Sequence, residues 1–404
     1  MRTGWFSIVA LVCFFGCSSG SGEEGIASDA DVFSRADAID ASDGVDGTDS
    51  LDGTTGSEDG SEGADEGDAI DGSDADQPAG PPAPVAYRGG TCPTLQAGSN
   101  TFLSSDLQRQ LTVTLPADPT GSGILFLWHG FGDTHSNFSA SVGAQQISNA
   151  HNVITISAQA AVDAFTTDKL SSFASFKGMI EGQIGQIPPT WSILDGPELD
   201  STLFDDLLSC VVEQYGANRS RVYSMGFSQG ALWTSKLSLI RSEYIAASVA
   251  WSGGLGNTSD LLGILGIDAL ILMDYEAPAR LIPMLTVSGT ESDAWPNTQF
   301  LVVDFNTGTK TFSEQLRSDG VANVYCEHDE VLYYESNTSF PQLLKLDDVP
   351  DPLPDGARVT AHTIPSDGLG WGLQFLFDHE WTANGISKYR GYDGAGFPAY
   401  CTFP

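Results

Sequence analysis

A serine set between two glycines is the residue of this chain best suited to covalent chemistry. Ser228 is the central residue of a G-x-S-x-G pattern at 226–230, Gly-Phe-Ser-Gln-Gly. A serine hydroxyl attacks a carbonyl carbon when a base takes its proton and N–H donors hold the oxyanion that forms. The pattern alone is not decisive, because residues 16–20, Gly-Cys-Ser-Ser-Gly, also fit it. The two copies of the pattern must be distinguished by the secondary structure expected around each of them.

The two copies of the pattern differ in what flanks them. Residues 221–225 have the composition of a buried strand, and residues 231–240 that of a helix. A strand, a tight glycine turn and a helix form a nucleophile elbow, which presents a serine side chain above a sheet. The N-terminus of the helix also favours the developing negative charge. We therefore predict that Ser228 is a nucleophile, whereas the copy at 16–20 belongs to an export signal.

A second glycine-containing loop could hold the oxyanion. Residues 129–133, His-Gly-Phe-Gly-Asp, directly follow the apolar run 124–128. In acyl-transfer enzymes with an elbow, one oxyanion N–H comes from such a loop and the other from the residue after the nucleophile. This nominates the main-chain N–H groups of Phe131 and Gln229. We expect His129 to have a structural role in the loop.

The elements that must position these residues alternate along the chain. Apolar runs predict strands at 111–115, 124–128, 153–156, 221–225, 244–251 and 281–287, and apolar stripes predict helices at 204–215, 231–240 and 373–383. Residues 160–200 lack a clear period and are expected to be loop and cap structure. Alternating strands and helices indicate an α/β fold with a mostly parallel sheet flanked by helices.

Four short motifs resemble those of a known group of enzymes. They are HGFGD at 129–133, SRVYSMGFSQGALW at 220–233, WSGG at 251–254 and AHTIP at 361–365. Together they resemble secreted α/β-hydrolase esterases, in particular the polyhydroxybutyrate depolymerase-like and feruloyl or acetylxylan esterase-like lipoproteins. The resemblance covers about 90–384. It implies the α/β-hydrolase fold, carboxylic ester hydrolysis through an acyl-enzyme, and a Ser–Asp–His triad in that chain order.

The resemblance assigns the base to a histidine near the C-terminus. His362 follows the expected strand 357–361, and its His-Thr-Ile-Pro matches the loop of the relatives. Ala361 stands where relatives carry glycine, and an unusual run, 329–356, precedes it. Those departures keep His328 as an alternative base. His379 is expected on the surface of the helix 373–383.

The acid should follow a strand that precedes this histidine. Relatives carry G-x-x-D there, usually after a histidine, whereas this chain has Ser288 in place of the histidine and its aspartate one residue late, at Asp293. Asp293 is the predicted acid, with Glu291 and Asp274 as alternatives. Its function would be to orient the imidazole and stabilise the imidazolium.

The sequence indicates the substrate less clearly than it indicates the type of reaction. Trp191, Trp233 and Trp251 are predicted to wall a substrate cleft, with Trp295 as a further candidate. The substrate would be an ester: a polyester, a plant cell-wall ester or a small ester. No metal site and no cofactor are implied. The alternative function is a surface binding protein that keeps the hydrolase fold without activity.

The N-terminus predicts export. A positive residue, an apolar run from Trp5 to Phe15 and a Gly-Cys junction describe a lipoprotein-type signal peptide over 1–17. Cys17 would then carry lipid and anchor the protein to a membrane. The expected location is the bacterial cell envelope, with the outer membrane favoured, or the medium after release. We expect a monomer.

A strongly acidic segment separates this signal from the rest of the chain. Residues 21–80 hold 19 acidic side chains and a single basic one, Arg35, within a chain of net charge −36. Such a stretch buries too little apolar surface to order itself, so 18–84 is predicted to be a disordered linker. The catalytic domain would span 85–404. The acidic charge argues against a nucleic-acid partner.

Four cysteines remain in the predicted catalytic domain. Cys92, Cys210, Cys326 and Cys401 form an even set in an exported chain, so disulfides are expected. Three pairings are possible. We prefer the pairing of Cys92 with Cys401, which bracket the domain.

Overall fold

The structure is a computed structural model of the whole chain. It describes residues 80–163, 181, 187–193, 198–256, 273–295, 303–335, 341–383 and 395–404. The predicted signal peptide, Cys17 and nearly all of the predicted linker lie outside the described residues. The predicted domain boundary at residue 85 therefore remains a prediction.

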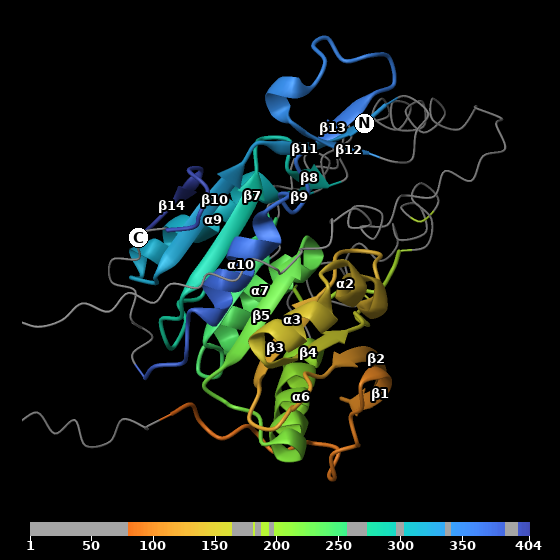
Figure 1. The fold of residues 1–404 in the computed structure, drawn as a ribbon, viewed down its shortest axis with the longest axis vertical. Coiled ribbons are helices and arrows are strands. Elements are labelled where there is room, and N and C mark those ends of the chain that lie inside the picture. Colours follow the sequence, from red (N-terminus) through yellow and green to blue (C-terminus); the bar gives the residue numbers. More distant parts are fainter. Residues whose placement is uncertain are drawn as a thin grey trace, which may run out of the picture.

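A nine-stranded sheet forms the centre of the described chain (Figure 1). Its order is β1-β2-β4-β3-β5-β6-β7-β10-β14. The strands are β1 (Gly98–Ser104), β2 (Leu107–Thr114), β3 (Gly123–Trp128), β4 (Val153–Ala158), β5 (Val222–Phe227), β6 (Ala247–Trp251), β7 (Met284–Gly289), β10 (Asn323–His328) and β14 (Cys401–Thr402). The strands from β4 to β10 in this order are parallel, and β1, β2 and β14 are antiparallel to their neighbours. The predicted mostly parallel sheet is confirmed.

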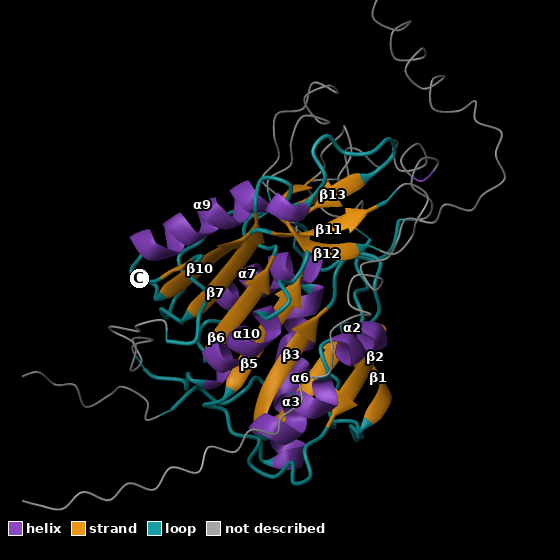
Figure 2. Cartoon of the chain, turned by 45° about the horizontal axis from the view of Figure 1, so that its top comes forward, coloured by secondary structure: helices purple, strands orange, loops and turns teal. Residues whose placement is uncertain are grey.

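Helices cover both faces of this sheet (Figure 2). One apolar core contains side chains of α6 (Leu199–Tyr215), α7 (Gln229–Ile240) and α9 (Phe305–Ser318). The other contains side chains of α2 (His135–Ser141), α3 (Ala144–His151) and α10 (Gly368–Phe377). Strand β3 shows why both faces are needed: Ile124, Phe126 and Trp128 pack into the first core, whereas its intervening leucines pack into the second. The chain is thus a three-layer α/β sandwich.

The late helix is shorter than predicted. The sequence pattern suggested 373–383, but α10 ends at Phe377, with Asp378 as its C-cap. Trp381 leaves the helical path because its N–H donates to the Ser220 carbonyl and its indole N–H to the Glu243 carbonyl. His379, expected on the surface, is instead buried after the helix end, where its Nδ1 lies 2.6 Å from the Phe375 carbonyl oxygen. Burial lowers the pKa of His379 to about 4.

The predicted disulfide is wrong. Cys92 pairs with Cys210 of α6, and Cys326 of β10 pairs with Cys401 of β14. The second pairing follows from the sheet, because β14 returns antiparallel to β10 and places Cys401 opposite Cys326 in register. The two ends of the described domain are therefore each fastened to a nearby central element and not to each other.

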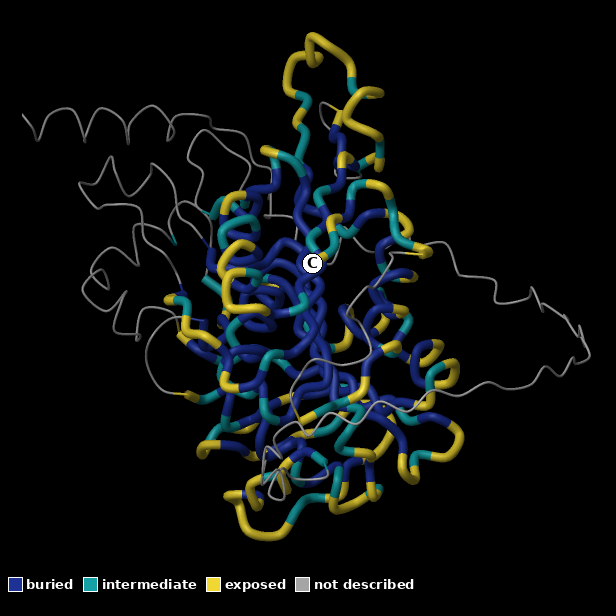
Figure 3. The backbone as a smooth tube through the Cα atoms, turned by 90° about the vertical axis from the view of Figure 1, so that its left-hand side faces the viewer, coloured by how far each residue is buried: buried dark blue, intermediate teal, exposed yellow. Residues whose placement is uncertain are grey.

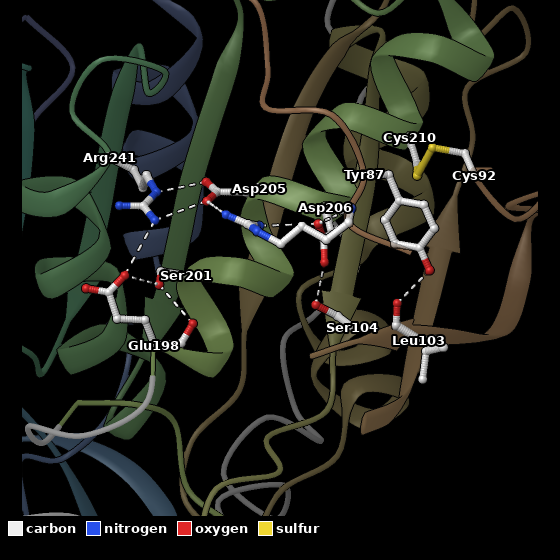
Figure 4. Close-up of polar contacts among 11 residues, drawn as sticks. Tyr87, Cys92, Leu103, Ser104, Glu198, Ser201, Asp205, Asp206, Cys210 and Arg241 are labelled. Atoms are coloured by element: carbon white, nitrogen blue, oxygen red, sulfur yellow. Dashed lines mark hydrogen bonds and ion pairs between the residues drawn. A yellow bond between two sulfur atoms is a disulfide. The ribbon is translucent and has the colours of Figure 1, made fainter. Parts of the chain in front are cut away.

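A polar network also fastens the N-terminal segment to α6 (Figure 4). The Arg88 guanidinium contacts both Asp205 and Asp206 at 3.3 Å, and Asp206 also accepts a hydrogen bond from Ser104. Arg241 donates to Asp205 from the other side. With the neighbouring Cys92–Cys210 bond, these contacts join β1, α6 and the end of α7.

A small second sheet lies beyond the carboxyl ends of the parallel strands of the main sheet. Strand β11 (Glu330–Tyr334) lies between β12 (Gln342–Lys345) and β13 (Arg358–Thr360), and both pairings are antiparallel. A short 3-10 helix, η4 (Leu346–Asp348), follows β12. A two-stranded ribbon of β8 (Ala294–Trp295) and β9 (Val303–Asp304) lies nearby (Figure 1). The unusual run 329–356 thus contributes two strands, β11 and β12, to a sheet of its own.

Within the residues that the structure describes, no helix has both the length and the apolar character that a bilayer span requires. The same residues contain no cluster of three or more histidine, cysteine or acidic side chains placed to hold a metal ion.

Candidate active site

Ser228 lies on a strained turn between β5 and α7. Its φ of 57° and ψ of −125° are unusual for a residue with a side chain, and the strain is characteristic of a functional turn. The turn is held because the Ser228 N–H donates to the Trp251 carbonyl of β6. A Cβ on Gly226 would collide with the Gly230 backbone, and one on Gly230 with the Trp128 carbonyl. Both glycines of the pattern are therefore required by close backbone approach.

The Ser228 hydroxyl is the first member of a hydrogen-bonded row. Its Oγ lies 2.9 Å from Nε2 of His362, and the His362 Nδ1 lies 2.7 Å from Oδ1 of Asp293. A carboxylate only accepts hydrogen bonds, so the ring proton lies on Nδ1 and Nε2 is left to accept the serine proton. All three side chains are at least 95% buried. The structure thus brings together the three residues that the sequence nominated separately.

The acidic member of the row is held by a turn at the end of β7. Asp293 closes this turn by donating its N–H to the Thr290 carbonyl at 2.8 Å. Its second carboxylate oxygen accepts from the Ser252 hydroxyl at 2.9 Å and from the Gly289 N–H at 2.8 Å. Both oxygens of a fully buried carboxylate are thereby satisfied, which fixes the side chain in one orientation.

His362 is placed by the segment that follows β13. Thr360 and Ala361, directly before it, donate hydrogen bonds to Ser292, the neighbour of Asp293. The imidazole is flanked by the rings of Phe305, at 4.4 Å between centroids, and Phe227, at 4.9 Å. These contacts restrict the ring to the plane that reaches both Ser228 and Asp293.

The alternative residues lie elsewhere. His328, the alternative base, is buried on β10, and its Nε2 lies 3.1 Å from the Thr363 carbonyl oxygen and not beside Ser228. Burial lowers the pKa of His328, which favours a neutral ring. Glu291 and Asp274, the alternative acids, are exposed. The geometry therefore favours His362 and Asp293.

The glycine-containing loop after β3 is held by His129. Its Nε2 accepts from the Ala160 N–H at 3.1 Å, so the ring proton lies on Nδ1, 2.7 Å from the Gly130 carbonyl oxygen. Burial lowers the pKa of His129 to about 4, so the ring is neutral near pH 7. A histidine bonded at both nitrogens inside the loop supports the structural role expected of it.

The two nominated oxyanion donors lie at the ends of elements that meet near Ser228. Gln229 is the first residue of α7, where a helix leaves backbone N–H groups without intrahelical acceptors. Phe131 lies in the loop after β3, the strand that pairs directly with β5. Its ring packs against that of Trp295 at 4.9 Å between centroids.

The three tryptophans predicted to wall a cleft are core residues. Trp191, Trp233 and Trp251 are no more than 1% exposed. Trp191 and Trp233 pack edge-on against Trp128, and Trp251 fills the space left by the absent Cβ of Gly372. Their size made them good candidates for a cleft, but they pack into the apolar cores on the two faces of the sheet. Trp295, the further candidate, is half-buried.

Two residues of the site were missed from the sequence. Ser252, which donates to Asp293, sits in the WSGG motif, and that motif was noted only as part of a resemblance. Its φ of 52° shows that this turn is held in an unusual conformation. Phe305, which stacks on His362, begins α9 and carries no sequence signal that separates it from other core aromatics.

Known proteins share the fold of this chain but little of its sequence. No protein-family model matches the chain. An alignment of 144 positions, covering 30% of this chain, is 29% identical to an oxidized polyvinyl alcohol hydrolase from a Pseudomonas species and spans 38% of that hydrolase. Two crystal structures are similar in fold: native sOPH, with 16% identity, and native pOPH, with 18%. Each match has a TM-score of 0.50 and covers 78% of this chain and 96% of the other. With the sheet order described above, this likeness shows that the chain has the α/β-hydrolase fold.

Proposed function

We propose that this protein is a serine hydrolase that cleaves carboxylic esters through an acyl-enzyme. The observation that carries the proposal is the row Ser228–His362–Asp293 at a strained elbow, with hydrogen bonds of 2.9 and 2.7 Å. Similarity to a curated hydrolase supports the same class of reaction.

The proposed first step forms a bond between Ser228 and the ester carbonyl carbon. As the Ser228 Oγ attacks, His362 Nε2 takes its proton, and Asp293 stabilises the imidazolium. The main-chain N–H groups of Gln229 and Phe131 are proposed to hold the oxyanion. The tetrahedral intermediate then collapses, and the leaving alcohol departs with the proton from His362.

The second step returns the enzyme to its starting state. Water replaces the alcohol, His362 removes a proton from it, and the hydroxide adds to the acyl carbon. Collapse of this intermediate releases the carboxylic acid and returns the proton to the Ser228 Oγ. Electrostatic stabilisation is strong here because the three residues are buried, so little water screens the developing charges.

A second candidate substrate comes from the curated relative, which is named for hydrolysis of oxidized polyvinyl alcohol. Oxidation of a secondary alcohol gives a ketone, whose carbonyl carbon the Ser228 hydroxyl could attack in the same way. The leaving group would then be a carbon and not an oxygen. Carbon is the poorer leaving group, so we favour the ester.

The test of the proposal is covalent labelling followed by a substrate panel. A fluorophosphonate probe should label Ser228, identified by mass spectrometry of the peptide that contains it, because only an activated serine reacts. A panel of p-nitrophenyl esters of graded acyl length should then be hydrolysed, and its best member defines the acyl preference. A folded protein that neither labels nor turns over any ester would instead be the binding protein that keeps the fold without activity.

Ser252→Ala should slow hydrolysis by about 10- to 150-fold with little change in KM, because a hydrogen bond to a carboxylate contributes roughly 1.5–3 kcal/mol. The loss acts through the orientation of Asp293. The matched control is Ser248→Ala, a buried serine in β6, the strand directly before Ser252, whose hydroxyl has no hydrogen-bond partner among the described residues. Steady-state kinetics that are equal for the two variants would refute a role of Ser252 in positioning the acid.

We also propose that the protein is exported and anchored through a lipid on Cys17, acting as a monomer without a cofactor or nucleic-acid partner. Two disulfides suit an oxidising compartment. Cys17→Ser should abolish incorporation of labelled palmitate and move the protein from the membrane to the soluble fraction. Unchanged fractionation would contradict the anchor.

A further inference from the structure

The side chain of Gln159 bonds to the loop that carries the proposed oxyanion donor Phe131. Gln159 is half-buried directly after β4, and the loop, residues 129–134, connects β3 to α2. The amide nitrogen of Gln159 donates to the Asp133 carbonyl oxygen at 3.1 Å, and its amide oxygen accepts from the His135 N–H at 3.0 Å. One amide thus satisfies two main-chain groups where the loop enters α2.

The same amide also reaches the beginning of the loop. Its nitrogen lies 3.0 Å from His129 Nε2, the atom that also accepts from the Ala160 N–H. Because the His129 ring proton lies on Nδ1, the Gln159 amide is the donor in this contact. Phe131 lies midway between the two ends that Gln159 contacts, so one side chain spans the turn that presents the Phe131 N–H.

A buried ion pair fixes the main chain of Gln159. An Nη of Arg109, on β2, lies 2.6 Å from Oδ1 of Asp200, on α6, and the two side chains are 1% and 0% exposed. Most of the backbone in the middle of the molecule is buried (Figure 3), and a charge in such surroundings needs a partner. The Arg109 guanidinium also donates two hydrogen bonds to the Gln159 carbonyl oxygen, at 3.1 and 2.7 Å. Because its main chain is fixed, Gln159 keeps its amide directed at the loop.

The ion pair also fixes a second side chain that bonds to the loop. The other carboxylate oxygen of Asp200 accepts from the Ser192 N–H at 2.7 Å. Trp191, directly before Ser192, donates its indole N–H to the His129 carbonyl oxygen at 2.9 Å. Buried ion pairs contribute little net stability compared with apolar residues of similar volume. This pair instead provides a fixed geometry for Gln159 and Trp191, which both bond to the loop.

We propose that Gln159 is a positioning residue of the oxyanion hole, which holds the loop so that the Phe131 N–H is aimed at the developing oxyanion. The inference rests on the proposed function, in which Phe131 and Gln229 donate to that oxyanion. Gln229 is fixed as the first residue of α7, whereas Phe131 lies in a loop whose position depends on contacts of this kind. A donor stabilises the oxyanion only if it is in place before the charge develops. A displacement of about 1 Å can cost about 100-fold in rate.

Gln159→Met tests the proposal, because methionine has a similar length but makes none of these hydrogen bonds. The matched control is Gln214→Met. Gln214 is a glutamine of α6 whose amide also bonds to main chain at both ends, 2.7 Å from the Leu95 carbonyl oxygen and 2.9 Å from the Leu95 nitrogen. These contacts involve none of the residues proposed to act in the reaction.

Three quantities are measured on the full chain of each variant. The first is kcat and KM on the best p-nitrophenyl ester of the panel. The second is the inhibition constant of a trifluoromethyl ketone, whose carbonyl carbon adds the Ser228 hydroxyl and so places an oxyanion in the proposed hole. The third is amide hydrogen exchange by mass spectrometry of the peptide that contains 129–135, with peptides of the main sheet reporting whether the variant is folded.

Gln159→Met should lower kcat by about 10- to 100-fold and change KM by less than about twofold, because the lost interaction acts only in the transition state. Inhibition by the ketone should weaken by the same factor as kcat/KM, and exchange in 129–135 should become faster. Gln214→Met should change none of these quantities by more than about twofold.

Unchanged exchange in 129–135 would overturn the proposal, and so would faster exchange with an unaltered kcat. A loss that lies wholly in KM would overturn it as well, because Gln159 would then act on substrate binding and not on the oxyanion. If exchange becomes faster but the parent chain hydrolyses no ester, Gln159 still holds the loop and the proposed function is refuted instead.

Discussion

Ser228→Ala is expected to reduce ester hydrolysis by at least about 1,000-fold, with the fold unchanged. The substitution removes the atom that would form the acyl-enzyme, and loss of a catalytic serine in such a row eliminates nearly all of the rate enhancement. Residual turnover would come from binding and oxyanion stabilisation alone. The measurement is kcat/KM on the best ester of the panel, with circular dichroism to confirm folding.

Ser238→Ala is the matched control for this prediction. Ser238 is also a buried serine, on the helix α7 that follows the elbow, but its hydroxyl donates to the Thr234 carbonyl and lies outside the hydrogen-bonded row. This variant should keep activity within about threefold. If Ser228→Ala retained a tenth of the parent activity, or if both variants lost activity equally, a nucleophilic role of Ser228 would be refuted.

The part of the site nearest the elbow was the most predictable from sequence. Gly226 and Gly230 make the elbow predictable, because no other residue fits at these positions, where α7 closely approaches β5 and β3. The requirement is local, so a short pattern with its flanking strand and helix contains it. The sheet was predictable for the same local reason, because its buried strands are continuous apolar runs in the sequence.

Asp293 and His362 were harder to predict than the elbow, because their placement depends on segments that are distant in the chain. Asp293 comes one residue later than in the resembling enzymes, yet the turn from Thr290 and the Gly289 N–H return its carboxylate to the site. The unusual run 329–356 made His362 harder to predict as the base for a similar reason. Because β11 and β13 pair antiparallel, the chain goes out and returns, and His362 reaches Ser228 regardless of the length inserted.

The wrong predictions share one physical cause. Whether a tryptophan such as Trp233 lines a cleft or fills the core is decided by what packs across from it, and Trp128 is more than a hundred residues away in the chain. The pairing of Cys326 with Cys401 depends likewise on β14, a strand of two residues whose sequence shows no period. Local patterns carry no information about such long-range partners.

His362→Gln and His328→Gln form a pair that identifies the base. His362→Gln should lower kcat/KM by at least about 1,000-fold, because glutamine fills a similar space but cannot carry a proton from Ser228. His328→Gln should lower it by less than about tenfold, since the Nε2 of His328 reaches only the Thr363 carbonyl oxygen. Glutamine can donate the same hydrogen bond through its amide.

The pH dependence sharpens this comparison. A general base works only in its deprotonated form, so the acidic limb of the kcat/KM profile reports the base of the reaction. His328→Gln must then leave the acidic limb unchanged, because burial lowers the pKa of His328 and it takes no proton in the reaction. A displaced acidic limb with a loss above 100-fold in His328→Gln, and near-normal turnover in His362→Gln, would transfer the role to His328. The hydrogen bond of 2.9 Å between His362 and Ser228 argues for the first outcome.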